Sequence, residues 1–257
     1  MIFYETIRER KMTELTGKLA LVTGAARGIG AGIALALADK GADVAITYER
    51  STERAAALVK AIEKKGRRGF AIQADSADAA AVKRSVNDAA AILGGLDILV
   101  NNAGIARVGP FADLPLTDID AMLNINVRAA VLAAQTAIHH MTQGGRIVTI
   151  GSNVSHRVPF GALTVYALTK SALLAFTQGL ARELGPLGIT VNLVQPGPID
   201  TDMNPANGDL AGLNLPFTAL GRYGIPADIG HAVAFLASPA ANYVTGSALT
   251  VDGGFNA

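Results

Sequence analysis

Tyr166 and Lys170 are the side chains of this sequence whose types and spacing best suit proton transfer. They are four residues apart, so a helix places them on one face, one turn from each other. A phenol titrates at about 10 in water, and a nearby ammonium group lowers that pKa by favouring the phenolate. The spacing predicts a phenol that gives or takes a proton near neutral pH, although a surface Tyr and Lys on an ordinary helix would share it.

Ser152 adds a hydroxyl group to this pair. It ends an apolar, β-branched run at 145–152, which predicts a strand whose end meets the start of the Tyr166 helix. Ser152 would hold a substrate oxygen while Tyr166 exchanges the proton, a division of labour suited to interconverting a carbonyl and an alcohol.

Composition excludes several classes of function. The chain has 257 residues, half of them apolar, which fits one large domain or two small ones. The net charge of +1 predicts no nucleic-acid partner. The chain has no cysteine, which excludes disulfides, thiolate metal sites and a cysteine nucleophile, and its four histidines predict no metal cluster.

The sequence also predicts no membrane span and no export signal. The longest uncharged run, 229–251, is broken by Pro239, Asn242 and Gly246, so no membrane span is predicted. The first residues mix charged and apolar side chains without an apolar core segment. We expect a soluble cytoplasmic protein.

The domain is expected over 12–257, because Met12 is a second plausible start and the chain runs from there into the first strand. Residues 1–11 are interpreted either as a disordered extension outside the fold or as a short helix packed on the body.

From Lys18 onward, apolar runs alternate with helical patterns. The expected strands are 19–23, 43–48, 69–74, 97–100, 145–152, 189–194 and 248–251. Helices are expected between them: one after the glycine-rich turn, one capped by Ser51, and others over 78–93, from about 117, around Tyr166, and over 227–237. This alternation predicts an α/β fold, a single Rossmann-like, doubly wound parallel sheet of about seven strands with helices on both faces.

The segment 196–224 is the one long irregular piece of the chain. It is rich in Pro, Gly and Asn, holds several large apolar residues, and follows the carboxyl end of a strand. These features favour a functional lid over a loosely packed surface excursion.

A glycine-rich turn, 23–30, follows the first strand. Gly24, Gly28 and Gly30 would let the backbone come close to a pyrophosphate at the start of a helix, where free N–H groups and the helix dipole favour an anion. Tight turns alone would use such glycines, but the position between strand and helix strengthens the interpretation.

Other polar residues lie at the expected carboxyl ends of strands, where such sheets bind ligands. Asp75 would accept from an adenine amino group, the run 101–104 supplies amide and small residues, and Thr201 in the run 196–201 would donate to a nicotinamide amide or a phosphate. Each alone also suits a turn residue. Asn126 lies inside the long helix, where Asn is mildly unfavourable, and also suits a satisfied core amide.

Together, the glycine turn, the Asn-Asn-Ala-Gly run, Ser152, the Tyr-x-x-x-Lys spacing and the Pro-Gly pair follow one order that resembles the short-chain dehydrogenase/reductase family, over residues 17–255. The pattern is most similar to 3-oxoacyl-carrier-protein reductases. The resemblance implies that Ser152, Tyr166 and Lys170 are catalytic and that Asn126 positions a water linking Lys170 to solvent. It places cofactor-binding positions at Gly24, Arg27, Ile29, Asp75, Asn102 and Thr201, with Lys170 at the nicotinamide ribose. The predicted cofactor site is completed from the motifs themselves by Gly28, Gly30, Tyr48, Arg50, Ala103, Gly104, Tyr166, Pro196, Gly197 and Ile199.

One departure concerns the separation of Ser152 and Tyr166, which is one residue longer than in many relatives. Asn153 occupies the shorter spacing. Ser152 is preferred because its strand aligns with the family strand without a gap, which leaves the extra residue in the loop 153–165.

The resemblance implies a carbonyl reductase in which Tyr166 protonates the carbonyl oxygen that Ser152 fixes, with a nicotinamide supplying hydride. Alternatives are a 3-oxoacyl-carrier-protein reductase, an NAD-dependent secondary alcohol dehydrogenase and a non-catalytic dinucleotide-sensing protein. The expected substrate is a modest, mainly apolar carbonyl compound, in a pocket formed by Val154, His156, Phe160, Pro198, Leu213 and Phe217. Only Arg222 is cationic near the lid, which disfavours an acidic carrier.

Assembly is predicted from apolar surface. The helix over 121–138 is apolar nearly all round, and Leu173, Leu174 and Phe176 are expected to add exposed surface on the Tyr166 helix. Burial across a two-fold interface would cover it, and the family resemblance suggests a homotetramer.

Cofactor choice depends on the end of the second strand. A dehydrogenase that prefers NAD usually places a carboxylate there, whereas this chain has Tyr48. Arg27 and Arg50 are expected to approach the same corner and bind a 2'-phosphate, unless they are ordinary solvated charges. Glu49 would favour NAD only if the strand turned early. We therefore expect NADP(H), with NAD(H) as the alternative and reduction as the working direction.

Overall fold

The computed structural model describes residues 14–257, so the expected extension over 1–11 lies outside the described residues. The described chain forms one seven-stranded sheet in the order β3-β2-β1-β4-β5-β6-β7, with every neighbouring pair parallel. The strands are β1 (Leu19–Val22), β2 (Asp43–Tyr48), β3 (Gly69–Gln73), β4 (Ile98–Asn101), β5 (Arg146–Ile150), β6 (Thr190–Pro196) and β7 (Ala248–Val251). The predicted doubly wound sheet is confirmed.

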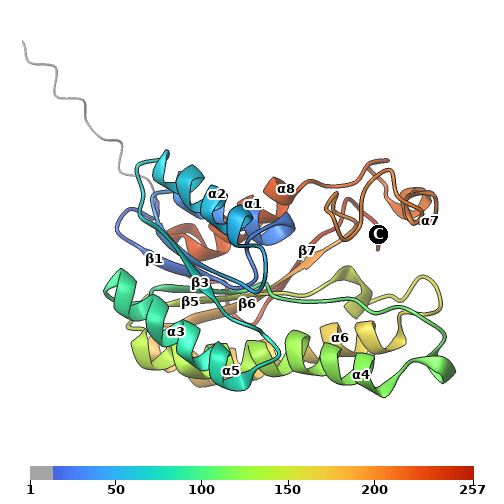
Figure 1. Ribbon diagram of the computed structural model, residues 1–257, viewed down its shortest axis with the longest axis horizontal. Helices are drawn as coiled ribbons and strands as arrows, with labels where there is room; N and C mark the ends of the chain where they lie inside the picture. The colour runs from blue at the N-terminus through green and yellow to red at the C-terminus, as the bar shows by residue number, and fades with distance from the viewer. Residues whose placement is uncertain (1–13) are drawn as a thin grey trace, which may run out of the picture.

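Helices cover both faces of this sheet, as Figure 1 shows. One layer holds α1 (Gly28–Asp39), α2 (Thr52–Glu63) and α8 (Pro226–Ala237), and the other holds α3 (Ala79–Leu93), α4 (Leu116–Met122), α5 (Ala129–Ala137) and α6 (Thr164–Leu184). A short helix, α7 (Ala211–Asn214), lies in the segment between β6 and α8. Two helical layers on one sheet give the strands apolar partners on both faces.

The two halves of the core, one on each face of the sheet, follow from the alternation of side chains along a strand. In β1, Ala20 and Val22 pack in the cluster with α1, α2 and α8, whereas Leu21 between them packs in the cluster with α3, α5 and α6. All three are fully buried. A continuous apolar run is therefore what a strand needs when both of its faces are covered.

The long helix predicted from about 117 is not one regular helix. It contains α4, a π-helical turn over Leu123–Arg128, α5 and a 3-10 turn over Ile138–His140. By length and composition, the run Leu116–His140 is the one described helix that could cross a membrane. Here it packs on the protein instead, with Ala133, Ala134 and Ala137 buried against the sheet.

Several boundaries differ from the sequence expectation. Ser51 precedes α2 but makes no side-chain capping bond, whereas Asp78 caps α3 by accepting from the Ala80 N–H. β5 ends at Ile150, so Ser152 begins a 3-10 turn instead of closing the strand.

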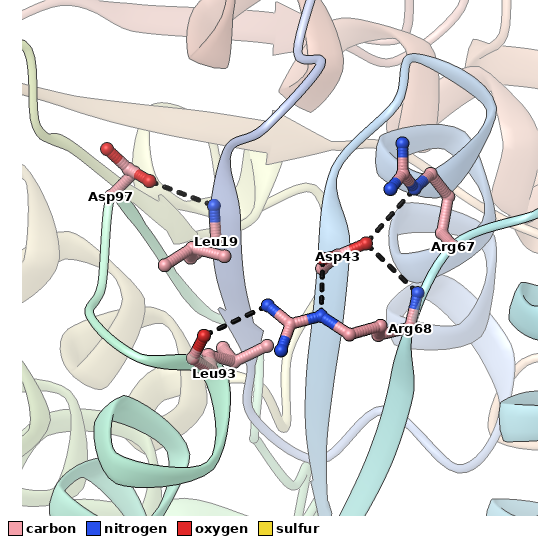
Figure 2. A network of polar contacts seen from close by, with 6 residues as sticks. All are labelled: Leu19, Asp43, Arg67, Arg68, Leu93 and Asp97. Carbon is pink, nitrogen blue, oxygen red and sulfur yellow. Dashed lines mark hydrogen bonds and ion pairs between the residues drawn. The ribbon is translucent and has the colours of Figure 1, made fainter.

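A polar network ties the amino ends of the strands together (Figure 2). Asp43 is buried at the start of β2 and accepts from the Nε atoms of Arg67 and Arg68 at 3.0 and 2.6 Å. Arg68 also donates to the Leu93 carbonyl at the end of α3, and nearby Asp97 accepts from the Leu19 N–H. This network lies at the edge opposite the carboxyl ends and therefore serves stability.

Candidate active site

The site begins between the carboxyl ends of β1 and β4, where the order of the strands in the sheet reverses. Such folds usually bind their ligands at this point. The Thr23 hydroxyl accepts from the N–H groups of Asn102 and Ala103. The Asn102 amide in turn donates to the carbonyls of Thr23 and Gly24 at 2.8 and 3.1 Å. A Cβ atom on Gly24 would lie 2.9 Å from the Ala103 Cα, so only glycine allows this approach. Asn102 and Ala103 thus hold the glycine turn in place.

The glycine turn leaves the start of α1 open to an anion. Arg27 occupies the N-cap position without a side-chain capping bond, and the first turn contains no acidic residue. Gly28 has a left-handed φ of 56°, which favours glycine. With Ile29 and Gly30, it presents backbone N–H groups at the positive end of the helix dipole.

The three candidate catalytic side chains meet between β5 and α6. The Ser152 hydroxyl is buried, where it donates to the Asn153 Oδ1 and accepts from the Val154 N–H, each at 3.4 Å, and it lies next to the Tyr166 side chain in the first turn of α6. Lys170 is buried one turn later. Its Nζ donates to the Ile150 carbonyl at 3.0 Å and lies 5.9 Å from the centroid of the Tyr166 ring. The structure therefore brings Ser152 against Tyr166 despite the longer spacing.

The electrostatics of the pair correct one expectation. Burial raises the pKa of Tyr166, and the hydrogen bond with Ser152 lowers it by a smaller amount. Burial lowers the pKa of Lys170 to about 8. The pKa of the Tyr166 phenol is therefore set mainly by desolvation and not by the neighbouring ammonium group. Tyr166 keeps its proton at neutral pH, as a proton donor must.

Asn126 is a fully bonded buried amide in the π-helical turn. Its Oδ1 accepts from the Ile105 N–H at 2.8 Å, and its Nδ2 donates to the Ile105 carbonyl and the Thr169 hydroxyl at 2.9 and 3.0 Å. It also lies beside the active site, because a Cβ atom on Gly104 would be 3.3 Å from both the Asn126 Oδ1 and the Lys170 Nζ. Asn126 thus joins the Gly104 loop to α6.

Two predicted adenosine-side residues occupy the ends of β2 and β3. Tyr48 is the last residue of β2 and is partly buried. Asp75 is exposed after β3, where its carboxylate accepts from the Ala77 N–H at 2.8 Å. The bond to Ala77 uses Asp75 as a turn residue, and its second oxygen stays available to a ligand.

The predicted residues after β6 have different surroundings. Only glycine fits at position 197, because a Cβ atom there would lie 2.6 Å from the Asp252 Cα. Ile199 is 4% exposed and packs in the core next to α1 and α8, so its side chain is structural. Thr201 lies over the glycine turn, with its Cγ2 only 3.5 Å from the place of a Cβ on Gly28. The segment 196–224, the expected lid, therefore begins directly above the glycine turn.

The arginine corner differs from its prediction. Arg50 is 88% exposed, and its Nε lies 2.7 Å from the Glu49 Oε1. Arg27 instead faces Asp202, together with Arg54 of α2. Sequence reasoning missed Arg54 and Asp202; the position of Arg54 in the first turn after β2 was the available signal.

The expected substrate pocket is partly assembled. Phe160 of the loop before α6 packs at a tilt against Phe217 of the expected lid with ring centroids 6.1 Å apart, and Phe217 packs at a tilt against the buried Phe255 at 5.4 Å. Arg157 lies 5.4 Å from the Phe217 ring, so Arg222 is not the one cation near the lid. Sequence reasoning missed Phe255 and Arg157.

The other pocket residues are more scattered. Val154 is buried, and Leu213 is 54% exposed. Pro198 lines a cavity of about 340 Å³ against α8, whose wall includes Arg222, His231 and Asp252 and none of the candidate catalytic residues. Within 14–257, no three His, Asp or Glu side chains are grouped as metal ligands.

These surroundings fit a dinucleotide. The uncapped start of α1 offers N–H groups to a pyrophosphate, and the glycine turn leaves no side chain in the way. Arg27 and Arg54 add two guanidinium groups for a further phosphate. Lys170 and Tyr166 lie at the other end of the same sheet edge.

Fold and site together define a Rossmann-type oxidoreductase, and comparison with known proteins gives the family. The family model described as enoyl-(acyl carrier protein) reductase matches residues 24–256. The chain belongs to the short-chain dehydrogenase/reductase family.

Three similar proteins narrow the class. A short-chain dehydrogenase from Burkholderia cenocepacia J2315, solved in complex with NADP, is 56% identical with a TM-score of 0.94, over 95% of this chain and 100% of that one. The cyclic-di-GMP-binding biofilm dispersal mediator protein of Escherichia coli K12 is 44% identical over 96% of this chain and all of its own. A hydroxynaphthalene reductase-like protein, Arp2, of Metarhizium robertsii is 38% identical over 96% and 97%. The protein is an NADP-dependent oxidoreductase of this family, and the expected cofactor is confirmed.

Proposed function

We propose that this enzyme is a carbonyl reductase that works with NADPH on a small, mainly apolar ketone or aldehyde. The observation that supports it best is the buried contact between Ser152 and Tyr166, with the Lys170 ammonium one helical turn away. The reductase name of the Arp2 relative is in keeping with this direction.

Each residue has a defined task in this proposal. Ser152 holds the carbonyl oxygen, and Tyr166, kept protonated by burial, donates its proton to that oxygen. Lys170 holds a positive charge 5.9 Å from the ring centroid and stabilises the phenolate that results. When bound, the nicotinamide supplies the hydride. Asn126 fixes the backbone beside Lys170 through both of its Ile105 bonds.

The direct test is NADPH consumption with a panel of ketones and aldehydes of graded size and aromaticity. We expect turnover of at least one apolar carbonyl compound, and a slower reverse reaction with NADP and secondary alcohols at neutral pH. Absence of turnover with the whole panel, while NADPH binds, would contradict the carbonyl reductase assignment.

A 3-oxoacyl thioester is a second candidate substrate, and Arg157 is the observation that favours it. Arg157 lies against Phe217 of the lid, whereas Arg222 is paired with Asp228 at 3.6 Å. A free guanidinium at the lid suits an acidic carrier or a phosphopantetheine group. Including an acetoacetyl thioester in the panel, with Arg157→Gln as the variant, separates the two substrate classes.

A dinucleotide-sensing protein without turnover is the remaining alternative, and the name of the Escherichia coli relative gives it weight. The intact Ser152, Tyr166 and Lys170 group favours catalysis, because sensing alone does not require it. Calorimetry with cyclic di-GMP, in the presence and absence of NADPH, distinguishes a sensor from an enzyme.

We also propose a homotetramer. Leu116, Leu123 and Val131 are exposed apolar residues along the irregular helical run Leu116–His140, and Leu168 is exposed on α6, which packs against the same run. The expected contribution from Leu173, Leu174 and Phe176 was wrong: Leu173 is 1% exposed, and the other two pack against the core. The apolar face is therefore made of other residues on the same helices.

A further inference from the structure

One carboxylate oxygen of the lid is shared by two arginines from different elements. Asp202 Oδ2 lies 2.5 Å from Nη1 of Arg54 in the first turn of α2 and 3.5 Å from Nη1 of Arg27 in the glycine turn. The bonds from Arg54 and Arg27 lower the pKa of Asp202, so it is an anion at neutral pH. The chain's own carboxylate therefore occupies an anion site that two guanidinium groups form.

The position of this anion site is fixed by its neighbours. Thr201, directly before Asp202, lies over Gly28 at the start of α1. α2 begins four residues after Tyr48, the strand end at which dinucleotide-binding sheets meet the adenosine ribose. An anion held by Arg27 and Arg54 is thus at the corner of the NADP site where a phosphate on the ribose must be recognised. Arg50 pairs with its chain neighbour Glu49 and not with Asp202.

The ion pairs of Asp202 with Arg27 and Arg54 are exposed enough for another anion to replace the carboxylate. The three side chains are each about half exposed, at 50% for Arg27, 57% for Arg54 and 54% for Asp202. Exposed ion pairs contribute little to stability, so a stronger anion can displace the carboxylate. A phosphate monoester carries nearly two charges and three acceptor oxygens, and a pair of guanidinium groups binds it with several charge-assisted hydrogen bonds.

We propose that Arg54, together with Arg27, determines specificity for the 2'-phosphate of NADP(H), and that Asp202 is a built-in competing anion which this phosphate displaces. The proposal depends on the dinucleotide site and not on the carbonyl chemistry. Displacement of Asp202 would release the Thr201–Asn204 turn, which the ion pairs of Asp202 with Arg27 and Arg54 otherwise tie to the start of α1 and to α2. A cofactor without the 2'-phosphate leaves this tie in place.

The test is calorimetric binding of two fragments, 2',5'-ADP and 5'-AMP, which differ in the 2'-phosphate and need no turnover. Arg54→Gln is expected to weaken 2',5'-ADP binding by about five- to tenfold and to leave 5'-AMP binding unchanged. Asp202→Asn is expected to strengthen 2',5'-ADP binding by about two- to fivefold, again without effect on 5'-AMP. In the Arg54→Gln background, the gain from Asp202→Asn should shrink, because the two residues act on one site.

Asp209→Asn is the matched control, since it removes one negative charge from an exposed position of the same segment. An equal gain with Asp209→Asn would show a general charge effect and overturn the proposal. Unchanged 2',5'-ADP affinity in Arg54→Gln, or unchanged or weaker affinity in Asp202→Asn, would overturn it as well. An enzyme that fails every carbonyl assay can still pass this test, so the two proposals fail separately.

Discussion

The side-chain amide of Asn256 donates a hydrogen bond to the backbone carbonyl of Asn153 across 2.8 Å. Asn256 is the penultimate residue of the chain, and Asn153 directly follows Ser152. The carboxylate of Asp252 accepts from the Asn256 N–H, and Phe255 is buried against the lid ring of Phe217. The end of the chain therefore supports both the lid and the backbone next to the candidate catalytic hydroxyl.

Asn256→Ala is expected to lower kcat by about two- to tenfold, because one hydrogen bond contributes about 0.5–1.5 kcal/mol and this one orients the Ser152 turn. NADPH affinity should change less than kcat, since Asn256 bonds to Asn153 and Asp252 and not to the glycine turn that would hold the pyrophosphate. Deleting Ala257 alone shortens the tail without removing the amide and is the control. Equal losses in both variants would indicate a general effect of the tail.

Tyr166→Phe is expected to reduce turnover by about 10²–10⁴-fold, the usual contribution of a positioned general acid. The phenol is partly buried and its hydrogen bond is to Ser152, so the variant should fold and bind NADPH. Tyr243→Phe removes a phenol that is fully exposed and should retain full activity. Near-normal turnover in Tyr166→Phe would remove the proton-donor assignment.

The fold could be predicted from the sequence because the local signals agree with the global arrangement. Continuous apolar runs such as Leu19–Val22 fit strands covered on both faces, and glycines mark the turns between strands and helices. The π-helical turn at Leu123–Arg128 had no such signal. Its buried Asn126 makes tertiary hydrogen bonds with Ile105, which no local pattern contains.

The catalytic residues could be proposed because helix geometry relates Tyr166 to Lys170 directly. Interactions across sequence distance could not be predicted: Arg54 meets Asp202 over 148 positions, and Asn256 meets Asn153 over 103. The pKa of Tyr166 was predicted in the wrong direction, because charge spacing is visible in a sequence and desolvation is not.

Lys170 should give the stability of the protein a distinct dependence on pH. Its pKa falls from 10.5 to about 8 on burial in the folded state. Below pH 8 both states hold the proton and the cost of burying the ammonium is fully present; between 8 and 10.5 only the unfolded chain binds it, so stability rises with pH. Relative to Lys170→Met, the wild-type free energy of unfolding should increase over this range by at most roughly 3 kcal/mol.

Urea unfolding at several values between pH 7 and 10.5 measures this difference. Lys83→Met, which removes an exposed lysine of α3, controls for the loss of one positive charge. A pH-independent difference between the wild type and Lys170→Met would show that burial does not shift the Lys170 pKa.

Asp43→Asn should destabilise the protein by about 1–3 kcal/mol, the cost of removing a charged partner from buried hydrogen bonds. Burial raises the pKa of Asp43, but bonds from Arg68 and the charge of Arg67 outweigh it, so the pKa lies below 3.8. The stabilisation is therefore present above pH 3.8 and is lost as the pH falls through the folded-state pKa. Thermal unfolding of Asp43→Asn at several pH values measures the loss of stability and its dependence on pH. Asp39→Asn, which removes an exposed ion pair with Lys65, is the control.

Sedimentation at micromolar concentration should show a tetramer, and a charge on the apolar face should dissociate it. Leu116 and Val131 are apolar residues of the α4–α5 run with 70% and 37% exposure. Burying a glutamate there without a partner costs far more than an apolar contact contributes, so Leu116→Glu or Val131→Glu should sediment as smaller species with unchanged helical content. Leu187→Glu alters a leucine of similar exposure, 56%, in the turn after α6 and should remain tetrameric. A wild-type monomer would exclude the tetramer, and a tetramer that survives both charged variants would place the interface on another face.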